Sequence, residues 1–383
     1  MIMNNMENNN SVCYVARINE IKPIPGADNI EQAIVGGWNC IVQKGQYAAG
    51  GLVVVATTDA VIPTELSDLM NVTNYLRKGG RVRTVKLRGV YSECLIIPLM
   101  YVPKGETIID TLTEGKDMME VMSIFKYEPP VRTISLGSGR KIRYQDNPNF
   151  HIYYKFPNLK NVDGMFTKDD IVEITRKIHG TNARYGIVKR SKVTLFHKLR
   201  KLFGNKWAEY EYVYGSHNVE KGSDSQGFYD TDVWAKVAED YNIKNKLWNW
   251  VKTHVGSPNE LGEGIILYGE IYGAGIQKGY DYGLTNMEFV GFDIKLNGEY
   301  MSTYDVYVGL DRLELPHVEE LYIGQWNQEV QDSFVFNNYI KGTKVPHEGI
   351  VIKHISGNRS KVAKVINPDY LIYGEKHDIG DSH

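Results

Sequence analysis

The 383-residue sequence has little cysteine, no long hydrophobic run and no excess of charge of either sign. Its three cysteines, Cys13, Cys40 and Cys94, are scattered and form no CxxC pair. This argues against a disulfide framework or a cysteine-rich zinc site and is typical of a reducing, intracellular compartment. The most apolar run, Leu95–Val102, contains a proline and falls far short of the roughly 20 residues of a membrane span. We therefore expect no membrane-spanning segment and no membrane partner.

The charge balance excludes a polycationic nucleic-acid coat protein. Lys plus Arg total 44 and Asp plus Glu total 46, for a net charge of −2, so any nucleic-acid binding must use a local basic surface. Hydrophobic residues make up 42% and charged residues 23%, which is an ordinary balance for a folded protein. Residues 1–10 are polar, without the basic and apolar parts of a signal peptide. We expect them to be a disordered tail.

Abundant glycine and tyrosine, with many short β-type runs, predict an α+β protein of two domains. Residues 11–135 contain five short strand patterns separated by glycine turns, which is typical of a small β-barrel. The strands are expected at Val12–Ile21, Gln32–Gly36, Cys40–Gln43, Leu52–Ala56 and Arg81–Leu87, with a closing helix at Asp117–Lys126. A linker at 136–152, which includes a Gly-Ser-Gly sequence, separates this domain from the next.

The second domain is expected at 153–370, with a tail at 371–383. Helical spacing of apolar residues predicts one helix over Asp232–Val255. Strand patterns lie at Ile171–Lys177, Ala183–Lys189, Lys192–Phe196, Glu209–Tyr214, Gly264–Glu270, Met287–Lys295, Gly349–His354 and Ser360–Val365. The predicted domain therefore consists of antiparallel sheets with flanking helices.

Lys177 and Gly180 form a Lys-x-x-Gly pattern. Glycine is frequent enough here that about one lysine in ten has a glycine three residues later, so the pattern alone is weak. It also fits a surface lysine before a turn. However, Lys177 ends an apolar strand and a second strand follows the turn, which favours a side chain that points into the fold.

Five further residues follow in an informative order. Glu270 ends an apolar strand, Phe292 lies between a glycine and an aspartate, Glu348 lies at a turn, and Lys353 and Lys364 lie on the last two strands. Each has an ordinary structural explanation: Phe292 in the core, the lysines in solvent, and the glutamates capping turns. Their order is that of the nucleotidyltransferase motifs in the covalent nucleotidyltransferases.

The resemblance extends beyond motif order. The sequence Lys-Ile-His-Gly-Thr-Asn at 177–182 resembles the adenylylation motif of nick-sealing RNA ligases. Tyr268–Glu270, with the Gly-Ile-Gln-Lys sequence that follows, resembles their third motif, and Glu348–Lys353 is similar to their fourth. Residues 21–28 resemble the start of tRNA-binding-type OB folds, and Arg83–Ser92 resembles the matching late strand and turn.

An OB domain that precedes the ligase domain is the layout of the Deinococcus-type RNA ligase family. DNA ligases and capping enzymes carry their OB domain after the last motif, and only about 19 residues follow Lys364 here. The resemblance implies an OB-fold barrel followed by a nucleotidyltransferase domain. A DNA ligase, a capping guanylyltransferase and a catalytically inactive nucleic-acid-binding module remain the alternatives.

The resemblance also implies a mechanism with ATP and either Mg²⁺ or Mn²⁺. Lys177 would attack the α-phosphorus of ATP and carry AMP, which then passes to an RNA 5′-phosphate before a 3′-OH displaces it. The lysine must first lose a proton, so nearby cations are needed to lower its pKa. Lys353, Lys364 and the divalent metal are the candidates, and they would also offset charge in the transition state. Glu348 would be the metal carboxylate. The remaining nucleotide contacts would come from Ile178, Asn182, Glu270 (ribose) and Phe292 (adenine stacking).

The partner implied is RNA with 3′-OH and 5′-phosphate ends, at nicks in duplexes, with the protein acting as a monomer. Arg83, Lys86 and Arg88 lie in an alternating basic stretch that would present cations on one face of a strand. Tyr91 and Trp38 could stack on bases, and Trp38 could equally be a core residue.

Three features depart from the family pattern. His217 occupies the place of a common arginine. Lys364 matches the last motif better than Lys361 does. The basic stretch at 198–206 has no counterpart, and it fits either an RNA-contacting insertion or a solvated turn.

Overall fold

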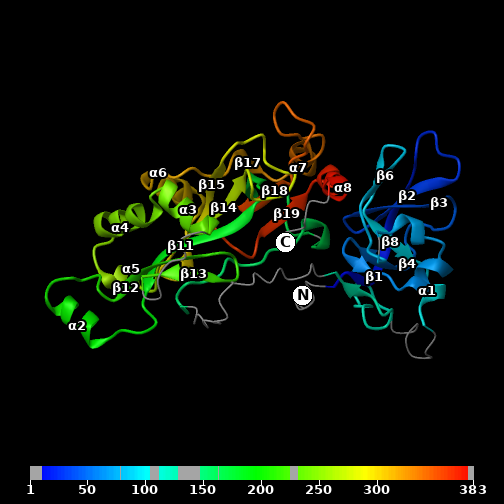
Figure 1. Ribbon diagram of the computed structural model, residues 1–383. Coiled ribbons are helices and arrows are strands. Elements are labelled where there is room, and N and C mark those ends of the chain that lie inside the picture. Colours follow the sequence, from blue (N-terminus) through cyan, green and yellow to red (C-terminus); the bar gives the residue numbers. More distant parts are fainter. Residues whose placement is uncertain are drawn as a thin grey trace. The chain divides into compact units, whose positions relative to one another are not determined.

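The computed structural model describes residues 11–77, 79–103, 112–127, 147–162, 164–224 and 232–377 (Figure 1). The expected tail at 1–10, most of the linker at 136–152 and the end of the tail at 371–383 lie outside these residues. The chain forms two compact units. Unit 1 comprises Met1–Thr133, Pro157–Met165 and Pro368–Tyr373, and unit 2 comprises Ile134–Phe156, Phe166–Asn367 and Gly374–His383.

Unit 1 is built on a five-stranded antiparallel sheet that curls on itself. Its order is β3 (Trp38–Gln43), β2 (Ile30–Val35), β1 (Cys13–Pro23), β4 (Leu52–Thr57) and β8 (Cys94–Ile97). The long strand β1 pairs with β4 through its first half and with β2 through its second half, with an irregularity between Ile18 and Glu20. The backbone N–H of Glu93 donates to the carbonyl of Asn39 at 2.7 Å, which joins the two ends of the sheet into a nearly closed barrel.

The barrel interior is apolar because alternate strand residues point inward. Ala33, Val55 and Ile96 are buried there. Val15, Val54 and Ile97 are also buried, but they lie on the other face of the sheet, in a second core that includes Met118. Trp38 is only 4% exposed and packs with the same strands, so it is a core residue and not a stacking platform. The smaller elements of this unit are α1 (Thr64–Leu69), η1 (Thr73–Tyr75), η2 (Leu99–Tyr101), η4 (Leu159–Asn161), and the two-stranded pairs β5 (Ala60–Val61) with β9 (Phe125–Lys126) and β6 (Val85–Leu87) with β7 (Val90–Ser92).

Two expectations for this unit are wrong. The helix predicted at Asp117–Lys126 is replaced by turns and by β9. Asp117 accepts a hydrogen bond from the backbone N–H of Met119, and Ser123 has a positive φ of 52°, which no α-helix tolerates. The strand predicted at Arg81–Leu87 is limited to Val85–Leu87.

Unit 2 contains two antiparallel sheets. The six-stranded sheet has the order β13 (Glu220–Ser223), β12 (Tyr210–Gly215), β11 (Thr181–Lys189), β14 (Gly264–Gly273), β15 (Met287–Leu296) and β16 (Glu299–Tyr300). The four-stranded sheet has the order β17 (Glu320–Gln325), β10 (Ile171–Lys177), β18 (Gly349–His354) and β19 (Val362–Ile366).

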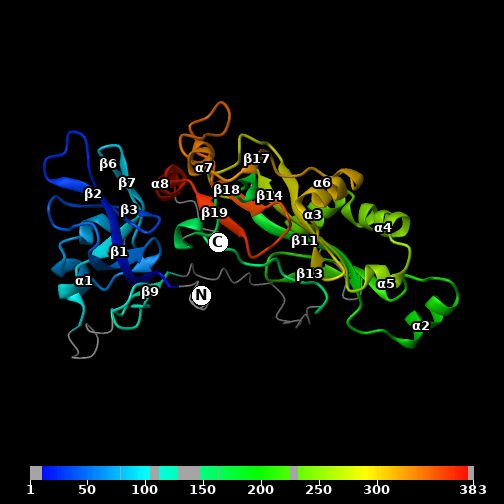
Figure 2. The ribbon, with the colours of Figure 1, turned by 180° about the vertical axis from the view of Figure 1, so that it is seen from behind.

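The two faces of the six-stranded sheet are buried differently. On one face, Ala183, Tyr185 and Ile187 of β11 pack in a core with α3 (Val233–Asp240), α4 (Ile243–His254) and α6 (Thr303–Arg312), which lie along the sheet in both ribbon views (Figures 1 and 2). On the opposite face, Val188 and Tyr268 pack with residues from the 150–156 segment. The remaining helices are α2 (Leu195–Leu202), α5 (Pro258–Leu261), α7 (Gln328–Val335) and α8 (Pro368–His377), of which α8 spans both units. No helix within the described ranges is both long and apolar enough to cross a bilayer.

Two further expectations change in unit 2. The single helix predicted over Asp232–Val255 is two helices, because Asn242 adopts a left-handed conformation with φ 51° and ψ 36°. The strand predicted at Lys192–Phe196 is wrong, because Leu195 begins helix α2. Thr194 and His197 form a capping box at that helix start, a signal that the strand interpretation overlooked.

Asn242 gives a test of this break. Asn242→Val should lower the free energy of unfolding by about 1–2 kcal/mol, because a β-branched residue is strained in the left-handed region. It would also remove the 2.7 Å hydrogen bond from the Asn245 side chain. Urea denaturation followed by tryptophan fluorescence measures this. The control Asn249→Val, on the exposed side of α4, should cost much less; equal losses would show that the turn at residue 242 is not under conformational constraint.

Candidate active site

The register of the four-stranded sheet places several predicted site residues on one face. Lys177 lies opposite Gly349, and Glu173 lies opposite Lys353. Lys364 of β19 lies opposite Val351. Because directly opposite residues and alternate residues along a strand share a face, Lys177, Glu173, Lys353 and Lys364 all project from the same side of the sheet.

A row across the six-stranded sheet contributes a second group. Asn182 of β11 lies opposite Glu270 of β14, which in turn lies opposite Val290 of β15. Next to this row, the β14–β15 register shifts between Tyr268 and Gly269, and this shift leaves Phe292 without a directly opposite residue. Such a bulge re-aims a side chain, and here it turns Phe292 toward the aromatic cluster on the same face.

Lys177 forms a close ion pair with Glu348. The Nζ of Lys177 donates to Oε1 of Glu348 at 2.6 Å, and Glu348 is only 1% exposed. His179 is equally buried, with its Nδ1 4.0 Å from the other oxygen of Glu348. Because Glu348 is buried and Lys177 is only partly exposed, water screens this ion pair less than it screens a surface salt bridge. Ile178, between the lysine and the histidine, is partly buried.

The turn after Lys177 is held by a loop that follows β14. Tyr282 accepts a hydrogen bond from the backbone N–H of His179 at 2.6 Å, and the Gln277 side chain donates to the carbonyl of Gly180 at 2.6 Å. The ring of Tyr280 packs edge-on against His179 with 5.0 Å between the ring centres. Gln277 belongs to the Gly-Ile-Gln-Lys sequence of the resemblance, so the structure shows what this residue contacts.

Gly180 and Gly349 lie so close to the backbone of neighbouring strands that no side chain fits at either position. A Cβ on Gly180 would lie 2.2 Å from the carbonyl oxygen of Ile271, and one on Gly349 would lie 2.1 Å from that of Val365. Both contacts are far below van der Waals distance and involve backbone atoms that cannot rotate away. The Lys-x-x-Gly and Glu-Gly patterns are therefore packing constraints as well as sequence signatures.

Glu270 is electrostatically coupled to the same ion pair. Burial raises the pKa of Glu270 to about 8, while Lys177 lowers that pKa and Glu348 raises it. Two acidic side chains and one lysine amine therefore share a small region, and the raised pKa shows that the single amine does not compensate a negative charge on both acids. Such a group suits a ligand that brings its own cation or hydroxyl donors.

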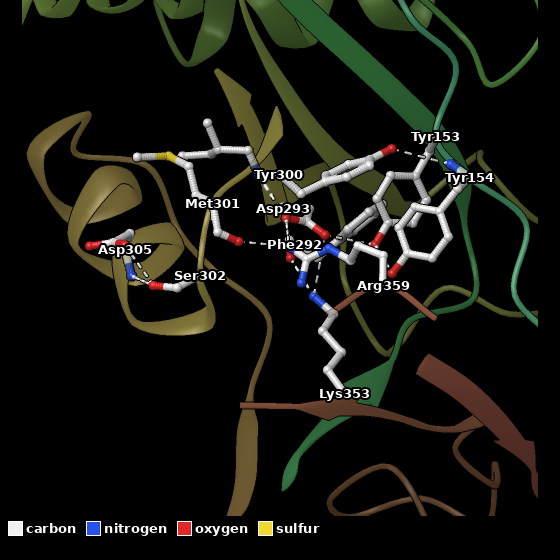
Figure 3. Close-up of polar contacts among 11 residues, drawn as sticks. Tyr153, Tyr154, Phe292, Asp293, Tyr300, Met301, Ser302, Asp305, Lys353 and Arg359 are labelled. Carbon is white, nitrogen blue, oxygen red and sulfur yellow. Dashed lines mark hydrogen bonds and ion pairs between the residues drawn. The ribbon is translucent and has the colours of Figure 1, made fainter. Parts of the chain in front are cut away.

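Phe292 lines a pocket together with Glu173, Thr303, Tyr307, Lys353 and Arg359. Lys353 and Arg359 both point toward Asp293, beside Phe292 (Figure 3). Lys353 Nζ donates to the carbonyl of Phe292 at 2.8 Å, and Arg359 donates to the fully buried Asp293 at 2.6 Å. The Phe292 ring is partly buried, and its centre lies 5.0 Å from that of Tyr153.

The structure does not bring Lys353 to Lys177. Lys353 lies opposite Glu173, four residues along β10 from Lys177, which is a separation of about 13 Å along the strand. The expectation that Lys353 assists the lysine amine directly therefore needs correction, because the strand register places it at the Phe292 end. Lys364, opposite Val351, lies between these two positions.

The structure also shows the surroundings of Lys361 and His217, the two residues that depart from the family pattern. Lys361 pairs with Asp170, and their hydrogen bond lowers the pKa of Asp170 to about 2. This engagement supports Lys364, rather than Lys361, as the match to the last motif. His217 is partly buried in the turn between β12 and β13, where burial lowers its pKa. The adjacent Ser216 carbonyl accepts a hydrogen bond from the buried Arg184.

Sequence reasoning missed four residues of this site: Glu173, His179, Asp293 and Arg359. Glu173 was hidden within an apolar strand, although a lone carboxylate in such a strand could have been a signal. His179 and Asp293 lay inside motifs that were cited for their neighbours. Arg359 lies in an irregular loop, where no periodicity indicates a direction.

The basic residues of unit 1 do not form one continuous face. Arg83 donates to the Tyr75 carbonyl at 3.1 Å, and Lys86 donates to the Tyr91 hydroxyl at 2.8 Å. Arg88 has a positive φ of 51° and lies in the turn between β6 and β7. The predicted alternation along one strand is therefore wrong, because only Val85–Leu87 is extended.

Comparison with known proteins identifies the class. A family model described as RNA ligase matches residues 170–366, just over half of the chain, and a model described as an OB-fold domain matches residues 12–99. The chain therefore belongs to the RNA ligase family. No curated protein matches.

Solved structures agree in fold. A variant of Naegleria gruberi RNA ligase with ATP and Mn is 22% identical, with a TM-score of 0.70 over 96% of this chain and 99% of that one. A variant with AMP and Mn gives the same values, and another without ligand is 20% identical with a TM-score of 0.67 over 96% of this chain and 98% of that one. These similarities confirm the expected α+β fold of an OB domain followed by a sheet-rich ligase domain.

Glu173 gives a pH-dependent test of the Phe292 pocket. Burial raises the pKa of Glu173 in the folded protein. At pH values above the ordinary glutamate pKa of about 4.3, the unfolded chain has therefore lost a proton that the folded protein still keeps. The stability contribution is then complete at low pH and falls as pH rises through the folded value. Glu173→Gln, which does not titrate, should flatten this fall, so it should gain stability relative to the parent at pH 8 more than at pH 4.

Urea midpoints at the two pH values measure this difference, with Glu299→Gln on exposed β16 as the control. A parallel shift of both variants at every pH would mean that the burial of Glu173 is not coupled to its proton.

Proposed function

We propose that this RNA ligase is ATP-dependent and joins 3′-OH and 5′-phosphate RNA ends at nicks in duplexes, through lysyl-AMP and an adenylylated 5′-phosphate. The observation that carries the proposal is the ion pair between Lys177 and the buried Glu348, at the start of a turn that accepts only glycine at 180. The family membership and the similar fold of an RNA ligase with ATP, AMP or Mn support it.

In the first step, the Lys177 nitrogen attacks the α-phosphorus of ATP. A phosphorus–nitrogen bond forms, the bond to the bridging oxygen breaks, pyrophosphate leaves, and the amine gives up a proton. Glu348 accepts a hydrogen bond from Nζ and so orients the amine. The turn at 178–180, held by Tyr282 and Gln277, fixes the strand end from which Lys177 projects.

A divalent cation fits the carboxylate chemistry of this region. Mg²⁺ or Mn²⁺ takes oxygen ligands and is commonly held by one or two carboxylates with phosphate oxygens and water. Glu348 would hold it, with Asn182 in support. The ion would supply positive charge to the phosphates during transfer.

The other residues would bind the nucleotide. Glu270, in the row with Asn182, would hold the ribose hydroxyls, and Phe292 would stack on adenine. Lys364 would reach the phosphates from β19. Lys353, bonded to the Phe292 carbonyl, would act at the base end by holding the backbone that carries the stacking ring.

After adenylylation, AMP passes to the RNA 5′-phosphate, and attack by the 3′-OH forms the phosphodiester and releases AMP. Arg83, Lys86 and Arg88 of the OB domain would contact RNA phosphates, although from a hairpin and its turn instead of one strand face. OB folds commonly bind nucleic acid through basic grooves and aromatic side chains.

Lys177→Ala should abolish acid-resistant labelling of the protein by ATP radiolabelled at the α-phosphate, because the nucleophilic nitrogen is gone. Lys168→Ala, an exposed lysine nearby in the chain, is the control and should label normally. Labelling of the Lys177→Ala protein at another lysine would overturn the assignment. Labelling by GTP in place of ATP would indicate a guanylyltransferase.

Glu348→Gln should raise the Mg²⁺ concentration needed for adenylylation and lower its rate about 10–100-fold, the range seen when groups that support a metal are lost. The amide keeps the size of the side chain but loses the charge. Titration of the labelling rate with Mg²⁺ measures both effects, and Glu320→Gln on β17 is the matched control. An unchanged metal requirement would reduce Glu348 to a turn residue.

The substrate proposal is tested by sealing assays on nicked duplexes that differ only in which strands are RNA. Sealing that requires RNA on the 3′-OH side of the nick supports it. Preferential sealing of all-DNA nicks would instead favour a DNA ligase activity on this fold.

A further inference from the structure

Helix α2 (Leu195–Leu202) lies within the connection between β11 and β12. It occupies the end of an extension of the six-stranded sheet, apart from α3, α4 and α6 (Figures 1 and 2). None of its residues is buried. The base of this extension is held at Tyr210, whose hydroxyl lies 2.9 and 2.8 Å from the carbonyl oxygens of Pro258 and Gly262 and shares its proton between them.

The helix has an apolar face that is exposed. Five large apolar side chains are involved, and their exposed fractions are high: Leu195 73%, Phe196 62%, Leu199 43%, Leu202 79% and Phe203 85%. Their spacing of i, i+1, i+4, i+7 and i+8 puts them on one arc of about 120° around the helix. A surface helix normally turns such an arc toward the core. Here the arc faces away from the core of its own unit.

The rest of the helix surface is cationic. Residues 189–206 contain seven lysines and arginines and no aspartate or glutamate. Lys198 and Arg200 are exposed and border the apolar arc on either side. Part of the charge is already balanced, since Lys201 pairs with Glu209 at 2.7 Å and Arg190 pairs with Glu211 at 3.1 Å.

We propose that α2 docks on the surface of an anionic lipid bilayer. An apolar arc bordered by lysine and arginine is the pattern of a helix that lies in the membrane interface, with its apolar side chains among the acyl chains and its cations at the headgroups. The helix has only two turns, so binding is peripheral and reversible. This departs from the expectation of no membrane partner, which considered only spanning segments.

Charge and area favour the bilayer over other occupants. RNA phosphates would satisfy Lys198 and Arg200 but would leave five large apolar side chains in water. A second copy of the chain would bring cations against cations at the border of the arc. An eight-residue helix also offers far less than the roughly 800 Å² per partner that a stable protein interface buries.

The test is flotation of the full-length protein with vesicles at millimolar lipid. We expect binding to vesicles of 70% phosphatidylcholine and 30% phosphatidylglycerol, and much weaker binding to pure phosphatidylcholine. The double variant Lys198→Gln with Arg200→Gln should lose about fivefold in partitioning for each cation, and so about 25-fold. Phe196→Gln with Phe203→Gln should abolish binding to both vesicle types.

Matched controls change the same residue types elsewhere. Lys236→Gln with Lys252→Gln, on exposed positions of α3 and α4, and Leu69→Gln, which is 69% exposed on α1, should bind vesicles like the parent protein. All variants should keep ATP-dependent labelling, since none belongs to the Lys177 site. This labelling checks folding independently of lipid.

A second measurement does not rely on loss of binding. Leu202→Cys can be labelled with a polarity-sensitive dye, because the native cysteines Cys13, Cys40 and Cys94 are all buried. Its emission should shift to the blue when anionic vesicles are added.

Three results would overturn the proposal. One is equal flotation of the parent, the cation variant and the apolar variant. Another is loss of duplex-RNA affinity in the cation variant without any vesicle binding by the parent, which would assign the surface to RNA. The last is lipid-free self-association that Phe196→Gln with Phe203→Gln removes, which would assign it to a second copy.

Discussion

The antiparallel pairing of β10 with β18 is the constraint on which the site depends. It sets Lys177 opposite Gly349 and places Glu348 immediately before the strand, so that the amine and the carboxylate meet at 2.6 Å. On its other side, β18 pairs with β19, and this second pairing requires glycine at 349, since a Cβ there would collide with the Val365 carbonyl. A sliding of the register by one residue would turn Lys177 to the other face and break the pair.

The same register divides the site into two ends. At the Lys177 end, the acidic groups of Glu348 and Glu270 lie near one amine, and the raised pKa of Glu270 shows that a second negative charge there lacks a compensating cation. An added cation would supply that compensation. At the Phe292 end, Lys353 and Arg359 both meet the single buried Asp293, so the cations there already have a fixed partner (Figure 3). This difference suits a ligand with a charged part near Lys177 and an uncharged ring near Phe292.

The sequence was most informative where chemistry and backbone geometry constrain the same residues. Lys177, Gly180 and Glu348 were identified because strand ends and obligatory glycines leave a pattern in the sequence. The distance between Lys353 and Lys177 could not be predicted in this way. It depends on the direction and register of the pairing between β10 and β18, and the sequence of one strand does not show either. Turns at 119–123 stand where a helix was predicted, because Asp117 hydrogen-bonds to the local backbone and Ser123 has a positive φ.

The residues at 192–206 show why an apolar pattern is ambiguous without its surroundings. Alternation over a few residues favoured a strand, whereas the capping pair Thr194 and His197 stabilises a helix start. Apolar spacing in a helix normally indicates which face is buried, yet Phe203 is 85% exposed. Apolar spacing therefore identifies the face of a helix that can be buried, but it does not identify the surface that buries it. In α3 and α4 that face meets the sheet, while in α2 the flanking cations indicate a surface outside the protein.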